Sequence, residues 1–155
     1  MFVTSNADTP VAVPDGQTSD EVKIDGFRRA WQALPKTVRH IVVLRDLTVS
    51  TDATRDCVYT VVAAGTQRPG PACALARSVA LRKDLGVATV RALRSGRYQQ
   101  IDLSDFVCGR TACAPVVGGV LVNGDIFGHL NATFMRTLGP YLLRALRRLQ
   151  AGWID

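Results

Sequence analysis

The spacing of apolar positions along the chain predicts strands at four places. A near-continuous apolar run in HIVVL, 40–44, has the length and composition of a parallel strand covered on both faces. YQQI, 98–101, predicts another strand, and PVVGGVLV, 115–122, predicts a strand or a hairpin that turns at Gly118–Gly119. MFVTSN at the start of the chain predicts a short strand, with residues 2–5 as an exposed sheet edge.

Helical periodicity fills the stretches between these strands. One helix is expected from a cap at Ser19 or Asp20 to Pro35. Two more are expected at 72–85 and 87–96, separated at Gly86, and a last one at about 130–149, restarted or kinked at Pro140. The segment from the end of the 40–44 run to about Pro71 is expected to be irregular. Strands alternating with helices predict an α/β sandwich, with 1–155 as a single domain.

Composition limits the class of protein. The 155 residues are 47% hydrophobic and 21% charged, which is typical of a folded globular chain. The longest apolar runs are too short to cross a bilayer, and the first residues do not have the pattern of a signal peptide. The formal charge is +6, but the arginines are scattered, and their one cluster, LLRALRRL, suits the C-terminal end of a helix. We therefore expect no nucleic-acid partner.

The four cysteines predict two disulfides. Cys108 and Cys113 flank a short Gly-containing turn, and Cys57 and Cys73 enclose a segment rich in Gly and Pro that a bridge would pin. Of the three connectivities, we favour the one that pairs neighbours in the sequence. Zinc is the rival interpretation, but neither spacing has the usual metal-ligand pattern, so no metal or cofactor is expected. Disulfides imply an oxidising compartment.

Candidate chemistry is expected at the carboxyl ends of the predicted strands. Arg45 and Asp46 follow the 40–44 run, and Asp125 follows GGVLV with His129 close behind it. A histidine can act as a general base while a nearby carboxylate fixes its tautomer. The alternative is structural, with Asp125 capping the last helix and His129 packing at its start. The residues alone favour this structural interpretation.

An ordered set of motifs resembles a known family. HIVVLRD is followed by Cys57 and Cys73 and then by IDLSDFVC…CAPVVGGVLVNGDIFGHLNATFMRTLGPYL. This order resembles SGNH-type hydrolase domains and, more narrowly, the extracytoplasmic SGNH domains fused to membrane acyltransferases of family three. The resemblance covers about residues 26–146. It implies a flavodoxin-like three-layer sandwich and acyl-ester chemistry on cell-envelope carbohydrate.

The resemblance also assigns roles to residues. His129 would be the general base and Asp125 its orienting carboxylate, while Asn6 lies near the family's oxyanion-hole asparagine block. Two departures are visible. The chain contains no Gly-Asp-Ser block and so lacks the family's nucleophile, and the family's Asp-x-x-His spacing is here Asp125-x-x-x-His129.

These expectations combine into one functional hypothesis with alternatives. The chain is expected to be the C-terminal part of an SGNH-like domain in an O-acyl (acetyl) transferase or esterase. A membrane acyltransferase domain upstream would hold it outside the cytoplasm, its substrate would be an envelope glycan or acyl ester, and the exposed edge strand would permit an oligomer. The isolated chain is expected to be a poor esterase. The alternatives are a non-catalytic SGNH-like binding module and a basic module that docks an anionic polymer.

Overall fold

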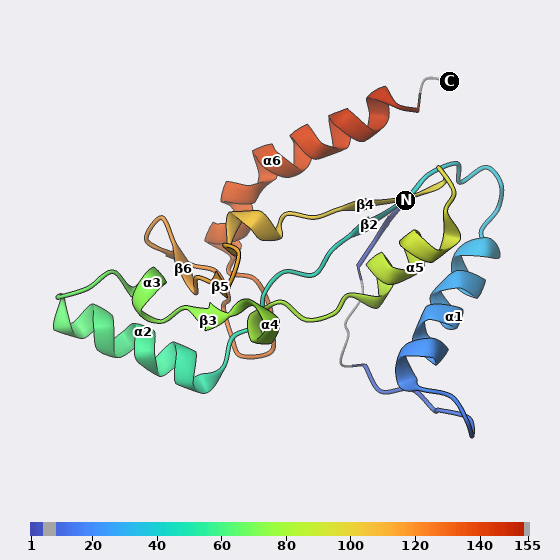
Figure 1. Ribbon diagram of the computed structural model, residues 1–155. Coiled ribbons are helices and arrows are strands. Elements are labelled where there is room, and N and C mark those ends of the chain that lie inside the picture. The colour runs from blue at the N-terminus through green and yellow to red at the C-terminus, as the bar shows by residue number, and fades with distance from the viewer. Residues whose placement is uncertain (5–8, 154–155) are drawn as a thin grey trace. The chain divides into compact units, whose positions relative to one another are not determined.

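The chain folds as two compact units, each with its own hydrophobic core. The computed structural model describes residues 1–4 and 9–153 (Figure 1). Unit 1 comprises Met1–Asp46 and Lys83–Asp102, and unit 2 comprises Leu47–Arg82 and Leu103–Asp155. The assignment of 1–155 to a single domain stays a prediction.

Unit 1 is built on a parallel three-stranded sheet. Strands β1 (Phe2–Val3), β2 (Ile41–Leu44) and β4 (Tyr98–Ile101) lie in the order β1-β2-β4, and both pairings are parallel. The central strand β2 is buried over its first three residues, as the apolar run predicts, because a central parallel strand loses solvent on both faces. β1 forms one edge of this sheet, and its Phe2 is exposed.

Helices α1 (Ser19–Gln32) and α5 (Leu85–Leu93) pack in the core of unit 1. Trp31 of α1 is buried beside β2 and stacks on Tyr98 of β4. The predicted cap at Ser19 or Asp20 is wrong by one or two residues. Thr18 caps the helix through a reciprocal box, in which its hydroxyl accepts from the Glu21 N–H and the Glu21 carboxylate accepts from the Thr18 N–H.

The two helices predicted at 72–85 and 87–96 are also wrong in their bounds. Leu75–Ala76 form strand β3, which pairs antiparallel with β5 (Ala112–Cys113), and only the single turn α4 (Arg77–Ala80) follows as helix. α5 then starts before Gly86, because the Asp84 side chain accepts from the Val87 N–H and caps the helix there. A strand partner distant in the sequence and a cap therefore override the local helical pattern.

The segment predicted to be irregular contains helix α2 (Asp52–Ala64) and the short helix α3 (Pro69–Ala72) of unit 2. Thr51 caps α2 by accepting a hydrogen bond from the Thr54 N–H, and Gly65 ends it in the left-handed conformation at φ +66°. The expectation of an irregular segment up to Pro71 is wrong, because the Thr51 cap and Gly65 enclose an uninterrupted run of residues compatible with a helix.

The predicted hairpin and last helix of unit 2 are both present. A 3₁₀ turn η1 (Ser104–Phe106) follows β4, and β6 (Val116–Val117) pairs with β7 (Val120–Leu121) as an antiparallel hairpin. Both glycines of its turn, Gly118 and Gly119, have positive φ, which explains the Gly-Gly pair. Helix α6 (Ala132–Ala151) begins after the Asn131 cap and continues through Pro140.

Both predicted disulfides are present. Cys57 of α2 is bonded to Cys73, and Cys108 is bonded to Cys113 in the core of unit 2. Two disulfides indicate an oxidising, extracytoplasmic environment. Across the described residues, no helix is both long and apolar enough to cross a membrane. The mixed α/β class with a parallel sheet is confirmed.

Candidate functional site

The Asp125–His129 loop is closed by backbone hydrogen bonds at its base. Asn123 and Leu130 form an antiparallel bridge. The Gly124 N–H donates to the His129 carbonyl at 2.8 Å, and the Asn131 N–H donates to the Val122 carbonyl, also at 2.8 Å. The loop thus leaves and re-enters the fold at one place, which brings residues 125 and 129 together.

Asp125 organises the interior of this loop. Its Oδ1 accepts hydrogen bonds from the Phe127 N–H at 2.9 Å and from the His129 N–H at 3.1 Å, while Oδ2 lies 2.5 Å from His129 Nδ1. Gly128 adopts φ +93°, a conformation that favours glycine. The carboxylate therefore reaches the ring four residues later through a turn of the loop. His129 does not open the last helix as expected, because that helix begins at Ala132 after the Asn131 cap.

The His129 ring is exposed, whereas Asp125 is half-buried. The hydrogen bond from the His129 ring, supported by the backbone N–H donors, holds the pKa of Asp125 below its ordinary value. The His129 side chain is 79% exposed. In the neutral ring with its proton on Nδ1, that atom donates to Asp125 and leaves Nε2 as an acceptor for a further group. Among the described residues, Asp125 is the only hydrogen-bond partner of the ring.

The surroundings of the pair differ in part from those expected. The strand before Asp125 is β7 of the antiparallel hairpin, and not a strand of the parallel sheet as expected. A small surface pocket in unit 2 is lined in part by Ser50, Thr54, Arg55, Tyr59, Asn123 and Asp125. His129 is not among the lining residues of this pocket. Asp125 therefore borders a hollow, while the imidazole that it holds is exposed at the surface.

The other two parts of the expected site are the oxyanion-hole residue and the nucleophilic serine. Asn6, the expected oxyanion-hole residue, lies outside the described residues. The chain contains no Gly-Asp-Ser block, and within the described residues no serine hydroxyl is hydrogen-bonded to His129. Within the described residues, the Asp125–His129 contact is thus formed without a serine hydrogen-bonded to the ring.

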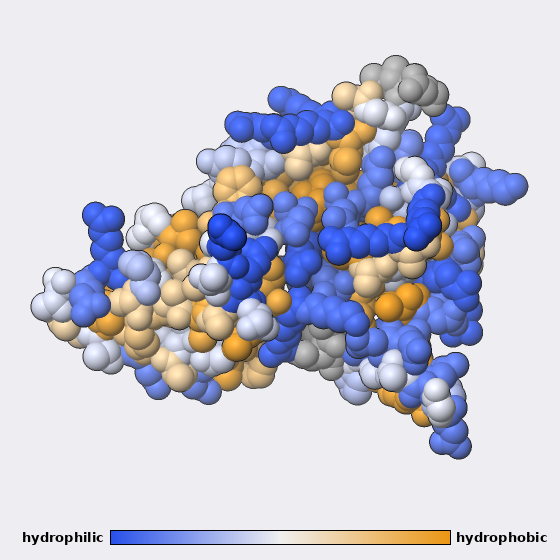
Figure 2. All heavy atoms as spheres, viewed as in Figure 1, coloured by the Kyte–Doolittle hydropathy of each residue, from blue (hydrophilic) through white to orange (hydrophobic). Residues whose placement is uncertain are grey.

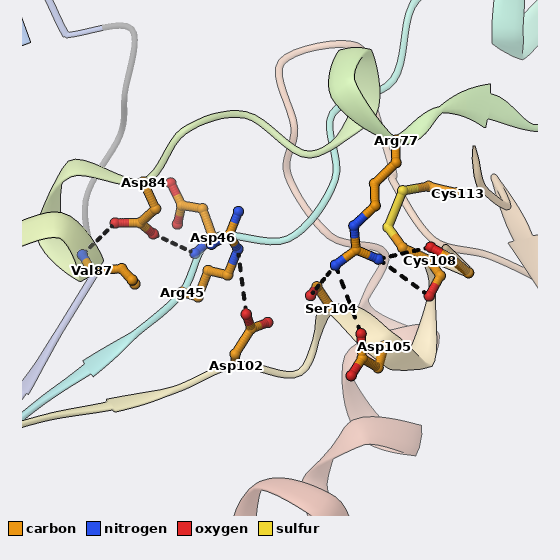
Figure 3. Close-up of polar contacts among 11 residues, drawn as sticks. Arg45, Asp46, Arg77, Asp84, Val87, Asp102, Ser104, Asp105, Cys108 and Cys113 are labelled. Atoms are coloured by element: carbon orange, nitrogen blue, oxygen red, sulfur yellow. Dashed lines mark hydrogen bonds and ion pairs between the residues drawn. A yellow bond between two sulfur atoms is a disulfide. The ribbon is translucent and has the colours of Figure 1, made fainter. Parts of the chain in front are cut away.

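A second polar cluster lies at the carboxyl end of the parallel sheet of unit 1, where Arg45 and Asp46 follow β2 as predicted (Figure 3). Arg45 Nε lies 3.7 Å from Asp102 Oδ2. The Asp46 N–H donates to Asp84 Oδ2 at 3.0 Å. Burial and, next, the charge of Asp84 raise the pKa of Asp46 to about 6, against the opposing effect of Arg45.

Asp84 is a residue that the sequence reasoning missed. It is 7% exposed, and its two oxygens accept from the Val87 N–H, in the first turn of α5, and from the Asp46 N–H, just after β2 (Figure 3). An aspartate directly before an apolar helical run is a cap signal, and this signal could have located it. Its role in this arrangement is to join a strand end to a helix start.

Arg77 is a second residue that was missed, in unit 2. Its Nη1 donates to the Gly109 carbonyl at 2.9 Å, and its Nη2 lies 3.5 Å from Ser104 Oγ and 3.7 Å from Asp105 Oδ1 (Figure 3). These contacts hold the loop that the Cys108–Cys113 bridge closes. Arg77 therefore satisfies backbone carbonyls of the fold and shows no arrangement specific to a reaction.

Neither the Asp125–His129 loop nor the cluster around Arg45 and Asp46 has the donor set of a metal centre. Among the described residues, no group of three or more histidine, cysteine, aspartate or glutamate side chains is placed to hold a metal ion. Comparison with known proteins finds no matching family model, no matching curated protein and no matching solved structure. A functional assignment therefore depends on the residues and their geometry.

Proposed function

We propose that Asp125 and His129 form the acid–base half of a Ser-His-Asp site that acts on acyl esters of cell-envelope carbohydrate. The observation that carries the proposal is the 2.5 Å contact between Asp125 Oδ2 and His129 Nδ1, with the imidazole exposed to solvent. The contact fixes the ring orientation and stabilises the imidazolium that forms during proton transfer, which are the roles of the carboxylate in such sites.

The chemistry requires a serine that these 155 residues do not supply in a Gly-Asp-Ser block. We place that serine in a segment outside the chain, in a flavodoxin-like SGNH domain of which this chain is the C-terminal part, joined to a membrane acyltransferase domain. His129 Nε2 takes the hydroxyl proton as the serine oxygen attacks the ester carbonyl carbon. It then returns that proton to the departing alkoxide oxygen as the carbon–oxygen ester bond breaks. A glycan hydroxyl or water subsequently accepts the acyl group from the serine.

A non-catalytic binding module is the second candidate, and one observation favours it. Asp125 accepts two backbone hydrogen bonds within its own loop, so loop architecture alone accounts for its presence. On this view the exposed imidazole has no reacting partner, and the unit binds a glycan without changing it.

The decisive experiment measures O-acetylation of the envelope glycan in cells that express this protein from its own gene. His129→Gln and Asp125→Asn are compared with the wild type by NMR of the purified glycan, with the protein level checked by immunoblot. We expect both variants to lose most of the acetylation, since loss of the orienting carboxylate in such sites costs roughly 10⁴-fold in rate. Ser78→Ala, an exposed residue on α4 that makes no hydrogen bond to Asp125 or His129, is the matched control.

Unchanged acetylation in His129→Gln at a normal protein level would overturn the catalytic proposal and favour the binding module. The purified 155-residue chain is a second test, with an acetyl-ester substrate. We expect little turnover. Robust turnover that His129→Ala abolishes would show that the nucleophile lies within this chain and that we have placed it wrongly.

A further inference from the structure

The last helix carries a strongly basic face that the roles above do not use. We define the basic face of α6 as its four arginines, Arg136, Arg144, Arg147 and Arg148. All four are exposed, and α6 contains no acidic residue. Within the part of the chain that the structure describes, no ion pair joins any of the four to a carboxylate. The positive charge of this face is therefore not compensated by the fold.

The arginines are gathered on one side of the helix, with apolar residues at both margins. At 3.6 residues per turn, the four arginines span an arc of about 120°. Tyr141 lies just beyond one end of this arc and Leu143 just beyond the other, and these side chains are 40% and 48% exposed. Figure 2 shows hydrophilic and hydrophobic residues side by side along α6, in the upper part of the view.

The margin at Tyr141 is an aromatic cluster. The rings of Tyr141 and Phe106 lie 4.3 Å apart between centroids, and Phe106 is itself 40% exposed. The guanidinium of Arg144 lies 5.7 Å from the centre of the Tyr141 ring. An apolar ring system directly beside cationic groups is the arrangement found where a protein meets the boundary between lipid headgroups and acyl chains.

Two simpler explanations account for only part of this face. Favourable interaction with the helix dipole applies to the last turn, where only Arg148 lies. An ordinary solvated surface would need no exposed tyrosine, phenylalanine and leucine at the margins of the charge. A soluble anionic polymer would use the charge but would leave those apolar groups in water. An anionic bilayer uses both.

We propose that the basic face of α6 docks unit 2 on the surface of an anionic lipid bilayer. The helix lies in the plane of the interface, its arginines contact headgroup phosphates, and Tyr141 and Leu143, at the two margins of the arc, contact the lipid at the level of the headgroups. Phe134 and Leu138 in the first half of α6 are buried in the core of unit 2, so the helix is held to that unit while its outer face meets the membrane. This inference does not depend on the acyl-ester chemistry proposed above.

The test is co-sedimentation of the full chain with vesicles. Vesicles of phosphatidylcholine alone are compared with vesicles that also contain phosphatidylglycerol, at low and at high salt. We expect binding only to the anionic vesicles, weakened by salt. The triple variant Arg144→Gln, Arg147→Gln, Arg148→Gln should bind about 100-fold less, because each basic residue near the surface contributes about 1 kcal/mol.

A control variant removes the same charge elsewhere: Arg39→Gln, Arg68→Gln, Arg110→Gln, all at exposed positions. It should retain most of the binding, and an equal loss in this control would overturn the proposal by showing that only net charge matters. Tyr141→Ser with Leu143→Ser should weaken vesicle binding and leave binding to soluble polyphosphate unchanged. Failure to bind anionic vesicles would also overturn the proposal. Vesicle binding that the Tyr141 and Leu143 changes leave unaltered would overturn it in favour of a soluble polyanion.

Discussion

The two disulfides close loops of very different length, and this difference predicts unequal contributions to the stability of unit 2. Cys57–Cys73 spans a sequence separation of 16, whereas Cys108–Cys113 spans 5. In the chain-entropy model, closing the longer loop restricts the unfolded chain by about 3 kcal/mol and closing the shorter one by about 2 kcal/mol. The longer bridge should therefore stabilise unit 2 by about 1 kcal/mol more.

Burial of the cysteines acts in the opposite direction. Cys108 and Cys113 are 4% and 2% exposed and belong to the core of unit 2, whereas in the other pair Cys73 is 6% exposed but Cys57 is only half-buried. Replacing the core pair with alanine would add a cavity cost to the loss of the cross-link. A direct comparison of the two double-alanine variants would mix these effects.

The assay should therefore compare the oxidised and reduced forms of two variants that each keep one bridge. In Cys108→Ala with Cys113→Ala, only the longer bridge remains, and in Cys57→Ala with Cys73→Ala, only the shorter one remains. Urea unfolding followed by circular dichroism gives the free energy of unfolding of each form. Since the side chains are the same before and after reduction, the difference isolates the cross-link. A larger oxidised-minus-reduced difference for the shorter bridge would refute the loop-entropy reasoning.

Two other predictions follow from close contacts in the structure. A Cβ at Gly70 would clash with the Val116 carbonyl oxygen, so Gly70→Ala should lower the free energy of unfolding by about 1–3 kcal/mol. Gly26→Ala, where a Cβ meets nothing within 4 Å, serves as the control in the same urea titration. Because the pKa of Asp46 is raised to about 6 in the fold, from 3.8, its contribution to stability is full below pH 4 and is lost as the pH rises towards 6. Asp46→Asn should flatten this part of the curve of unfolding free energy against pH. The change should be on the order of 1 kcal/mol, because solvent screens a partly exposed group. An unchanged slope between pH 4 and 6 would contradict the raised pKa of Asp46.

Some features could be predicted because neighbouring residues decide them. The Gly118–Gly119 pair specifies the hairpin turn, since both residues need positive φ. The apolar run at 40–44 specifies a buried strand, and β2 is the central strand of its sheet. The disulfide pairing also followed from short separations in the sequence.

Other features were missed because partners distant in the sequence decide them. Leu75–Ala76 is extended because it pairs with Ala112–Cys113, although its local pattern is compatible with a helix. Asp84 was overlooked because half of its role is a hydrogen bond to the backbone of Asp46, which lies 38 residues away. No local periodicity contains either contact.

The candidate site shows the same division. The sequence by itself determined that an aspartate and a histidine lie four residues apart beside two glycines, and this spacing left both a structural and a catalytic interpretation open. Only the tertiary structure decided that the Asp125 carboxylate meets His129 Nδ1 outside any helix, because the Asn123–Leu130 bridge and the backbone hydrogen bonds at its base close the loop. Only the tertiary structure, likewise, leaves the imidazole exposed and makes Asp125 a lining residue of a pocket, since burial depends on what the rest of unit 2 packs against.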